Sequence, residues 1–494
     1  MSAQSLPSEV TEALERGDYF EARTALAPLA ANENAQAQYQ YGILLLRGQG
    51  GPLAFEDGIV MLESAAAQDH TLAALLLARL YLTGSAAGAP HDPERAAEFL
   101  AIAAAQNNGE AQYYLGLLYQ SGSGVAKDPA RAFSLFQRAA ETGDREAQYE
   151  LSKAYANGQG TDIDKTEALR WLRVAADSGQ AEAQFFLANA LNTGRGVARD
   201  QAEAQKWYRR AAENGIPLAQ RILGGQYLTG DDITAANPKE ALRWLGLAAE
   251  AGDPGAMHNL AMAYGGEYGI ARDDAKALLW YGRASEAGLA RSTYALAHYY
   301  EQGRGVPANM EQAALTYRKA LEQGEDRAGL RLGYLTGQGL LDPYMPPHFG
   351  VDWALAAART GDADARSWLQ RHADNGLRTA QTAFALLLLD DAGQAADAAP
   401  YLEQAAMAGD VTAQFEVGTL YTTGLGVTLD YVQAHKWLNI AAASGHEKAR
   451  ERRDVLGDLM TGEQIAAAQT AARVFFETAS ERLPEGVAGN RRAQ

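Results

Sequence analysis

A short motif recurs along most of this 494-residue chain: two small residues followed by a glycine two or three positions later. The glycines that close it are Gly143, Gly179, Gly215, Gly252, Gly288, Gly324, Gly361, Gly409 and Gly445, which lie 36 or 37 residues apart except for one interval of 48. Two more degenerate copies precede them, which makes about eleven units. A fixed period of this length indicates stacked repeats rather than several independent globular domains.

Each unit contains two stretches with the apolar period of an amphipathic helix, for example "AQYYLGLLY" and "ALRWLRVAA". A Gly-x-Gly between them ends the first helix, because glycine adopts a positive φ at a helix C-terminus without steric cost. An Asp or Asn, often followed by Pro, then begins the second helix. The pattern predicts a helical hairpin whose apolar side must be buried against neighbouring hairpins.

Two positions of the unit indicate how the hairpins pack. The residue after the Leu of the first helix is always Gly, Ala or Ser, as expected where two helix backbones approach closely: Gly42, Ala78, Gly116, Ser152, Ala188, Gly224, Ala261, Ala297, Gly333, Ala385 and Gly418. Six of the seven tryptophans lie eight residues before a closing glycine: Trp171, Trp207, Trp244, Trp280, Trp353 and Trp437. A large apolar residue at a fixed phase predicts a core position, and burial of ~200 Å² contributes roughly 5 kcal/mol gross.

These features resemble the Sel-one-like repeat family, a subclass of the tetratricopeptide-like helical repeats. The likeness is clearest in "AQYYLGLLYQSGSGVAKDPARAFSLFQRAAETGD" and "AQFEVGTLYTTGLGVTLDYVQAHKWLNIAAASGH". The resemblance implies an all-α fold, a right-handed α-solenoid of about eleven helix-turn-helix repeats whose first helices line a concave face. It also implies scaffold or adaptor work through protein–protein contacts, often in bacterial signalling, envelope or secretion contexts.

The ends and the interior irregularities define the expected organisation of the chain. Residues 1–34 are expected to form N-terminal capping helices, residues 35–446 the repeat solenoid, residues 447–482 C-terminal capping helices and residues 483–494 a disordered tail. Thr461 and Gln464 have the spacing of a capping box, which predicts the start of a last helix. The 48-residue interval contains an additional helix, "ADARSWLQRHADNG", which is either a damaged repeat or a bend in the solenoid.

Charge and composition argue against several classes of partner. The balance of 43 basic to 61 acidic residues gives a net charge of -18, which disfavours nucleic acid and anionic membranes as general partners. Cysteine is absent, and no stretch approaches the ~18 apolar residues of a membrane span. The N-terminal residues lack the pattern of a signal peptide, so we expect a cytoplasmic monomer, with a periplasmic location as the alternative if a signal peptide was removed before residue 1.

Sequence motifs for cofactors, metals or catalysis are not found. The Gly-x-Gly turns lack the further residues of a dinucleotide or phosphate loop. In "GRGVARDQAEAQKWYRRAAENG" the cations Lys206, Arg209 and Arg210 therefore flank a core Trp207 and are expected to reach solvent. The eight histidines lack zinc-like spacing. We expect no catalytic, cofactor-binding or metal-binding residue.

The predicted function is a non-catalytic scaffold or adaptor that binds a protein or peptide on the concave face. The first alternative is an exported regulator or assembly factor for cell-envelope or polysaccharide machinery. The second is a hydrolase-like enzyme with a site built across the groove.

Function is expected where the repeats differ, on the inner face of the first helices. The residues three and six positions after the Ala of the "AQ" pair vary between repeats and share one helical face. We expect a stripe of these residues to bind an extended peptide or a partner helix, the alternative being a hydrated groove. Its members are Tyr114, Lys153, Asn189, His298 and Tyr334.

A Pro-rich segment, "DPYMPPHFG", is the second candidate. Its Tyr344, His348 and Phe349 either pack against the next hairpin or form a binding loop, because long loops often carry function.

Overall fold

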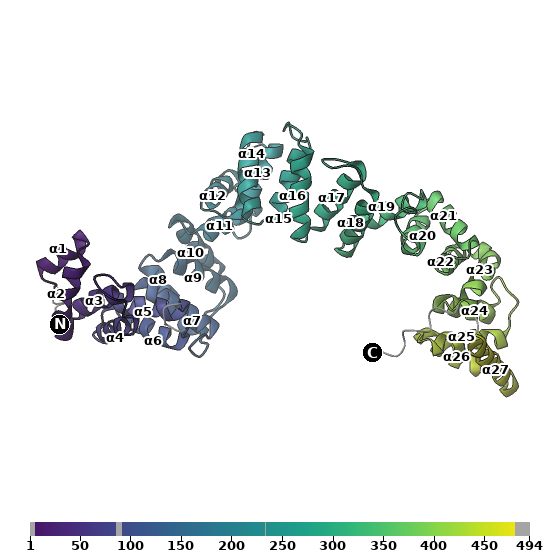
Figure 1. Cartoon of the computed structure of the whole chain (residues 1–494), viewed down its shortest axis with the longest axis horizontal. Helices are drawn as coiled ribbons and strands as arrows, with labels where there is room; N and C mark the ends of the chain where they lie inside the picture. Colours follow the sequence, from purple (N-terminus) through teal and green to yellow (C-terminus); the bar gives the residue numbers. More distant parts are fainter. Residues whose placement is uncertain (1–4, 85–90, 233, 480–494) are drawn as a thin grey trace. The chain divides into compact units, whose positions relative to one another are not determined.

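The computed structural model describes residues 5–84, 91–232 and 234–479 (Figure 1). These parts of the chain form α-helices joined by turns and two short 3₁₀ segments, and contain no strand. The helix-turn-helix repeats predicted from the sequence are confirmed. The chain divides into two compact units, residues 1–251 and residues 252–494. The segment expected to be a disordered tail, residues 483–494, lies outside the described residues.

The N-terminal unit runs from α1 to α14, and each helix packs against the next in the chain. Its helices are α1 Ser8–Arg16, α2 Tyr19–Ala31, α3 Ala35–Arg47, α4 Phe55–Ala66, α5 Thr71–Thr83, α6 Pro93–Ala105, α7 Gly109–Ser121, α8 Pro129–Glu141, α9 Arg145–Asn157, α10 Lys165–Asp177, α11 Ala181–Thr193, α12 Gln201–Glu213, α13 Pro217–Thr229 and α14 Pro238–Glu250. From α3 onward, odd-numbered helices are the first and even-numbered helices the second of each hairpin.

The C-terminal unit runs from α15 to α27 and keeps this alternation up to α20. Its helices are α15 Pro254–Tyr264, α16 Asp274–Glu286, α17 Ala290–Gln302, α18 Met310–Glu322, α19 Asp326–Gly337, α20 Val351–Arg359, α21 Ala363–Asp374, α22 Arg378–Leu389, α23 Ala395–Met407, α24 Val411–Thr423, α25 Tyr431–Ala443, α26 Glu447–Gly457 and α27 Gly462–Ala479, with 3₁₀ segments η1 Pro347–Phe349 and η2 Ala392–Gln394.

Helix starts and stops follow the predicted signals. At the start of α8, the Asp128 carboxylate accepts a hydrogen bond from the Arg131 backbone N–H at 3.0 Å. At the end of α7, Gly122 has φ 81°, the left-handed conformation that closes a helix. The predicted capping box is also confirmed, since Thr461 and Gln464 exchange side-chain to backbone hydrogen bonds of 2.9 and 3.3 Å.

The column of small residues is the place where the two helices of a hairpin meet. A Cβ on Gly116 would lie 2.6 Å from the Phe136 ring, and one on Gly224 would lie 2.6 Å from Leu245 Cγ. The prediction of close packing is therefore confirmed. The side chain that contacts the small residue, Phe136 or Leu245 in these two repeats, is the one directly after the position that tryptophan occupies in most repeats. The tryptophans are also buried, at 4–9% exposure for five of the six, whereas Trp353 is half-buried.

The second glycine of the Gly-x-Gly turn joins one repeat to the preceding one. A Cβ on Gly160 would lie 2.0 Å from the carbonyl oxygen of Pro129, and one on Gly124 would lie 2.3 Å from the carbonyl carbon of Pro93. Only glycine allows this approach to the start of the preceding second helix. Gly196 is an exception, because a Cβ added there would have no atom within 4 Å.

The glutamine of the "AQ" pair is a buried hydrogen-bond donor. The Gln112, Gln148, Gln184 and Gln220 side-chain amides donate to the carbonyl oxygens of Ala104, Ala140, Ala176 and Ala212, at 3.0–3.4 Å. Each accepting carbonyl lies in the last turn of the preceding second helix, where the backbone lacks helical partners. The glutamine therefore satisfies that carbonyl and joins consecutive hairpins.

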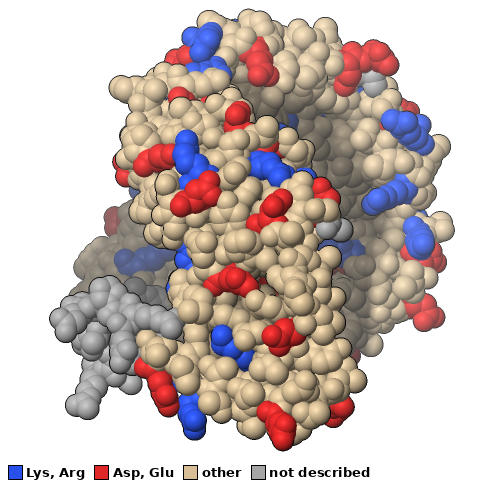
Figure 2. All heavy atoms as spheres, turned by 90° about the vertical axis from the view of Figure 1, so that its right-hand side faces the viewer, with Lys and Arg blue, Asp and Glu red and all other residues tan. Residues whose placement is uncertain are grey.

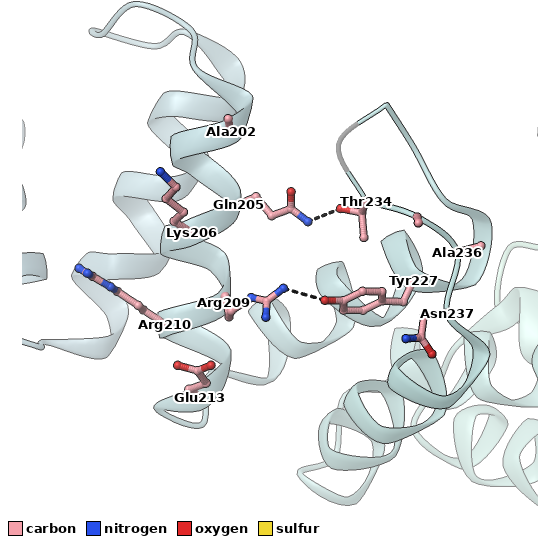
Figure 3. Close-up of a pocket in the computed structure, with 11 residues that line it drawn as sticks. Ala202, Gln205, Lys206, Arg209, Arg210, Glu213, Tyr227, Thr234, Ala236 and Asn237 are labelled. Carbon is pink, nitrogen blue, oxygen red and sulfur yellow. Dashed lines mark hydrogen bonds between the residues drawn. The ribbon is translucent and has the colours of Figure 1, made fainter.

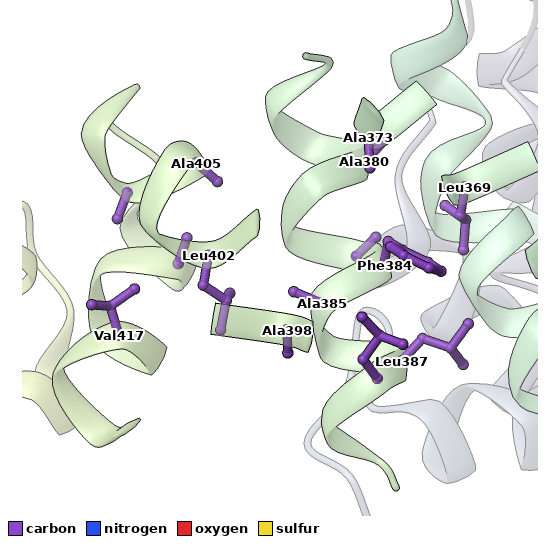
Figure 4. Close-up of a cluster of buried hydrophobic side chains, with 14 of the residues drawn as sticks. Leu369, Ala373, Ala380, Phe384, Ala385, Leu387, Ala398, Leu402, Ala405 and Val417 are labelled. Carbon is purple, nitrogen blue, oxygen red and sulfur yellow. The ribbon is translucent and has the colours of Figure 1, made fainter. Parts of the chain in front are cut away.

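The additional helix of the 48-residue interval is α21, a single helix between two hairpins. It packs against α19, α20 and α22. Trp368, the tryptophan outside the repeat column, is 1% exposed, and its indole N–H donates to Asp342 Oδ1 at 3.0 Å. Figure 4 shows that the core continues from α21 into the next hairpin: Leu369 on α21 lies beside Phe384 and Leu387 on α22. A continuous core thus accommodates the irregular helix.

Candidate binding site

A cleft of about 290 Å³ opens on the first helices of the C-terminal unit. Its helical lining, which defines the α15–α17 cleft, comes from His258 and Met262 on α15, Tyr281 on α16, Arg291, Tyr294, Ala295, His298 and Tyr299 on α17, and Arg327 on α19. His258 and Tyr294 occupy the second position after the "AQ" alanine, and Met262 and His298 occupy the sixth. The cleft therefore includes the variable sixth position of two consecutive repeats.

Arg304 holds the wall of the cleft in place. It follows the glycine that ends α17 and donates to the Gly265 carbonyl at 3.1 Å and to Asp274 Oδ1 at 2.8 Å. Its guanidinium lies 4.2 Å from the centroid of the Tyr299 ring, which is a cation–π contact. These contacts join the α15–α16 hairpin to the following one, so the cleft has a fixed shape.

His258 is neutral at physiological pH. Its Nδ1 lies 2.8 Å from Ser292 Oγ, and its ring packs edge-on against Tyr281 at 5.6 Å. Burial lowers the pKa of His258 to about 4, with a further contribution from the nearby positive charges of Arg291 and Arg327. Burial also raises the pKa of the Tyr281 hydroxyl above its ordinary value. Both groups therefore act as hydrogen-bonding groups without charge.

Arg291 is the free cation of the cleft. Its side chain is exposed, and among the described residues it makes no ion pair. The position before the "AQ" alanine is Glu110, Glu146 and Glu182 in three consecutive repeats of the N-terminal unit. An acidic residue suits the first turn of a helix, whereas an arginine is opposed by the helix dipole. Arginine stands at this position in two consecutive repeats, as Arg291 and Arg327, and both line the cleft; this pair is the sequence signal that could have identified the site.

His298 belongs to a hydrogen-bonded network beside the cleft. Its Nδ1 lies 3.3 Å from the Tyr317 hydroxyl, which donates to Glu301 Oε2 at 2.8 Å. Arg331 from α19 donates to both carboxylate oxygens of Glu301. Burial alone would raise the pKa of Glu301, but the hydrogen bonds from Arg331 and Tyr317 hold it below its ordinary value. The network fixes the position of the one predicted stripe residue that lines the cleft.

The predicted residues of the N-terminal unit make contacts within their own repeats. Asn189 accepts a hydrogen bond from the Tyr208 hydroxyl at 2.7 Å, across its own hairpin. The Lys153 ammonium pairs with Glu150 at 2.5 Å and lies 4.8 Å from the Tyr149 ring centroid. Tyr114 is half-buried. These three residues lie on first helices, but the structure does not place them in the α15–α17 cleft.

The other predicted residues come after the cleft residues in the sequence of the C-terminal unit and do not line the cleft. Tyr334 on α19 is 43% exposed, with the Arg331 guanidinium 4.8 Å from its ring centroid. In the Pro-rich segment, Tyr344, His348 and Phe349 are exposed, so part of each side chain is accessible to solvent. Met345 of that segment packs against a core cluster that includes Leu341, the residue directly before the segment.

The lining of the cleft consists mainly of aromatic, basic and small apolar side chains. Within the described parts of the chain, no group of three or more His, Asp or Glu side chains is close enough to hold a metal ion. No helix in those parts is long and apolar enough to cross a bilayer. Positive and negative side chains are interspersed over the face seen in Figure 2. Tyrosine, arginine and methionine at the cleft are residue types enriched at protein interfaces.

Comparison with known proteins gives a consistent answer on the fold. The sequence model of the Sel1 repeat matches nine segments: residues 35–70, 71–108, 109–144, 145–180, 181–216, 217–253, 254–289, 290–325 and 411–446. The interior segment without a match, residues 326–410, contains the Pro-rich loop and α21. No match was found among curated proteins.

Two of the solved structures that are similar to the chain are Sel1-type repeat proteins. The first is a protective antigen present in uropathogenic Escherichia coli strains that displays an SLR fold, with 27% identity, 94% of this chain and 98% of that chain covered, and a TM-score of 0.61. The second is a Sel1 repeat protein from Oxalobacter formigenes, with 28% identity, 67% and 94% covered, and a TM-score of 0.48.

Proposed function

Because the chain belongs to the Sel1 repeat family, whose members generally act as protein-interaction scaffolds, we propose that it binds an extended segment of a partner protein in the α15–α17 cleft. The family is typically non-catalytic. The repeated core supplies a rigid support, and the variable residues of the first helices supply the specificity.

The observation that carries the proposal is the concentration of interface-type side chains around a fixed cleft. Tyr281, Tyr294 and Tyr299 provide apolar rings with polar hydroxyls, which make large contacts at low conformational cost. Glu267 is the acidic residue of the lining, and Arg291 is exposed and not paired with an acid in the described structure. A carboxylate of the partner can therefore form a charge-assisted hydrogen bond with Arg291.

In the proposed binding mode, the uncharged polar groups of the cleft form hydrogen bonds with the peptide backbone. Neutral His258 and the Tyr294 hydroxyl offer hydrogen bonds to main-chain groups of an extended segment. Ala295 keeps the middle of the cleft open because its side chain is small. Binding then depends on both an open cleft and the Arg291 charge.

The test compares variants of the cleft with a matched control. A partner is first identified by affinity purification from the native host, and its affinity for the purified chain is then measured by calorimetry. Arg291→Ala removes the proposed anchor and Ala295→Trp fills the cleft. Arg318→Ala is the control, since it removes one arginine from α18, where Arg318 pairs with Glu322 at 3.5 Å.

We expect the two cleft variants to lose at least tenfold in affinity while the control retains the affinity of the unaltered chain. All three should melt close to the unaltered chain. Equal affinities for all four proteins would show that the partner binds elsewhere.

A further inference from the structure

A second cleft, of about 800 Å³, lies in the N-terminal unit between α12 and the loop that joins α13 to α14. Its lining includes Lys206, Arg209 and Arg210 on α12, Tyr227 on α13 and Thr234 in the loop (Figure 3). It is built on a second helix, away from the variable positions of the first helices. The proposed function in the α15–α17 cleft makes no use of it.

The three cations of this cleft have no acidic partner among the described residues. The Arg209 side chain donates to the Tyr227 hydroxyl at 2.7 Å, and the Arg210 guanidinium lies 4.6 Å from the Trp207 ring centroid. All three side chains are exposed, as the sequence predicted. Glu213 is the acidic residue of the lining. A positive cleft is therefore present on a chain whose net charge is -18.

The neighbouring repeats show why Lys206 is unpaired. At the same position of the unit, Arg170 pairs with Glu167 at 2.8 Å and Arg243 pairs with Glu240 at 3.3 Å, each three residues earlier. The equivalent acid in α12 is Glu203. Its Oε1 instead accepts a hydrogen bond from the Trp207 indole at 3.3 Å and lies 4.0 Å from Arg173. The α12 repeat has thus lost an ion pair that the repeats on either side retain.

The far wall of the cleft is held by hydrogen bonds. Gln205 on α12 donates to Thr234 Oγ1, and the Thr234 backbone N–H donates to Asp231 Oδ1 at 2.6 Å. Thr234 is 5% exposed. These contacts tie the loop to α12. In Figure 3, Gln205 and Arg209 point toward the loop, whereas Lys206 and Arg210 extend from the opposite side of the helix, where they are open to a partner.

We infer that this cleft binds an acidic segment of a partner protein in an extended conformation. Lys206 and Arg210 are four residues apart on one side of α12 in Figure 3, which places them ~6 Å apart along the helix axis. Alternate residues of an extended chain are ~6.6 Å apart and face the same side. Two acidic residues at alternate positions therefore match Lys206 and Arg210, and Arg209 is available to a third acceptor on the loop side.

The test uses the full chain and a synthetic probe, a fluorescein-labelled peptide of eight residues that alternates Glu and Ser. Binding is followed by fluorescence anisotropy at low and at physiological salt. The test variant is the double change Lys206→Gln and Arg210→Gln. The control is Arg170→Gln with Arg243→Gln, which removes the same charge from the neighbouring second helices but leaves α12 intact. Circular dichroism melts verify that both variants fold.

We expect saturable binding that weakens with salt, a loss of at least tenfold in the test variant and less than a threefold change in the control. A matching peptide of Gln and Ser should not bind. Failure of the acidic peptide to bind, or an equal loss in both variants, would overturn the inference. Displacement by a single-stranded RNA octamer at a lower concentration than the unlabelled peptide would also overturn it, in favour of a nucleic-acid site. Because the probe is synthetic, none of these results depends on the α15–α17 cleft.

Discussion

Gly160 and Gly196 provide a matched pair for testing how consecutive repeats are joined. Both are the second glycine of a Gly-x-Gly turn, with φ of 75° and 76°. An alanine at either site costs roughly 1 kcal/mol for a left-handed backbone, offset in part by ~0.4–1 kcal/mol because alanine restricts the unfolded chain. The two substitutions should therefore differ only through what surrounds the new Cβ.

The surroundings differ sharply. At Gly160 the Cβ would lie 2.0 Å from the Pro129 carbonyl oxygen, whereas nothing lies within 4 Å of the corresponding position at Gly196. The obstacle at Gly160 is backbone, so relief requires α8 and the turn to move apart. Overpacking of this kind costs ~1–3 kcal/mol. We therefore expect Gly160→Ala to be about 2 kcal/mol more destabilising than Gly196→Ala.

Native-state hydrogen exchange is the suitable assay, because a repeat protein can open locally. A difference of about 2 kcal/mol corresponds to a roughly 30-fold faster exchange for the most protected amides of α8 to α10 in Gly160→Ala. Gly196→Ala should change the exchange of α10 to α12 by less than about fivefold. Equal effects of the two substitutions would refute the reasoning, since the second glycine would then serve only to permit a positive φ.

The core and the α15–α17 cleft offer three further tests. Trp207→Ala should cost ~3–5 kcal/mol of local stability, measured by hydrogen exchange of α11 to α13, because the indole is only 7% exposed; an effect no larger than that of Trp353→Ala at its half-buried site would contradict this. Gln148→Leu should cost ~1–2 kcal/mol in urea unfolding by leaving the Ala140 carbonyl without its side-chain donor, and a neutral result would mean that water replaces the amide. For His258, the pKa falls from 6.5 in the unfolded chain to about 4 in the folded chain, so its contribution to stability is complete above pH 6.5 and is lost as the pH falls toward 4. His258→Gln should therefore lose less melting temperature between pH 7 and pH 5 than the unaltered chain, and an equal loss would exclude His258 as a source of the pH dependence.

The regular part of the fold could be predicted from the sequence because its causes are local. Helix periodicity, Asp and Asn at helix starts and glycine at helix ends act within one or two turns, and the structure has them where the pattern indicates. The role of Gln148 could not be predicted in this way, because its acceptor lies in the preceding helix. The contact of Gly160 with Pro129 likewise joins residues about one repeat apart.

The candidate sites depend on departures from the repeat, which are harder to interpret from one sequence. The stripe included His298 but not Arg291, whose signal was an arginine at the same first-turn position of two consecutive repeats, Arg291 and Arg327. The cations of α12 were correctly expected to be exposed. Lys206 lacks an acidic partner because Glu203 bonds to Trp207 rather than pairing with Lys206, and sequence spacing alone gives no sign of that choice.

Hydroxyl-radical footprinting of the chain with its purified partner is the most direct test of the proposed binding surface. Met262 and Tyr294 line the α15–α17 cleft, whereas Phe20, at 73% exposure in the N-terminal unit, provides an internal reference. We predict that complex formation slows oxidation of Met262 and Tyr294 several-fold and leaves Phe20 unchanged. Unaltered oxidation of both cleft residues in a fully formed complex would contradict the proposal.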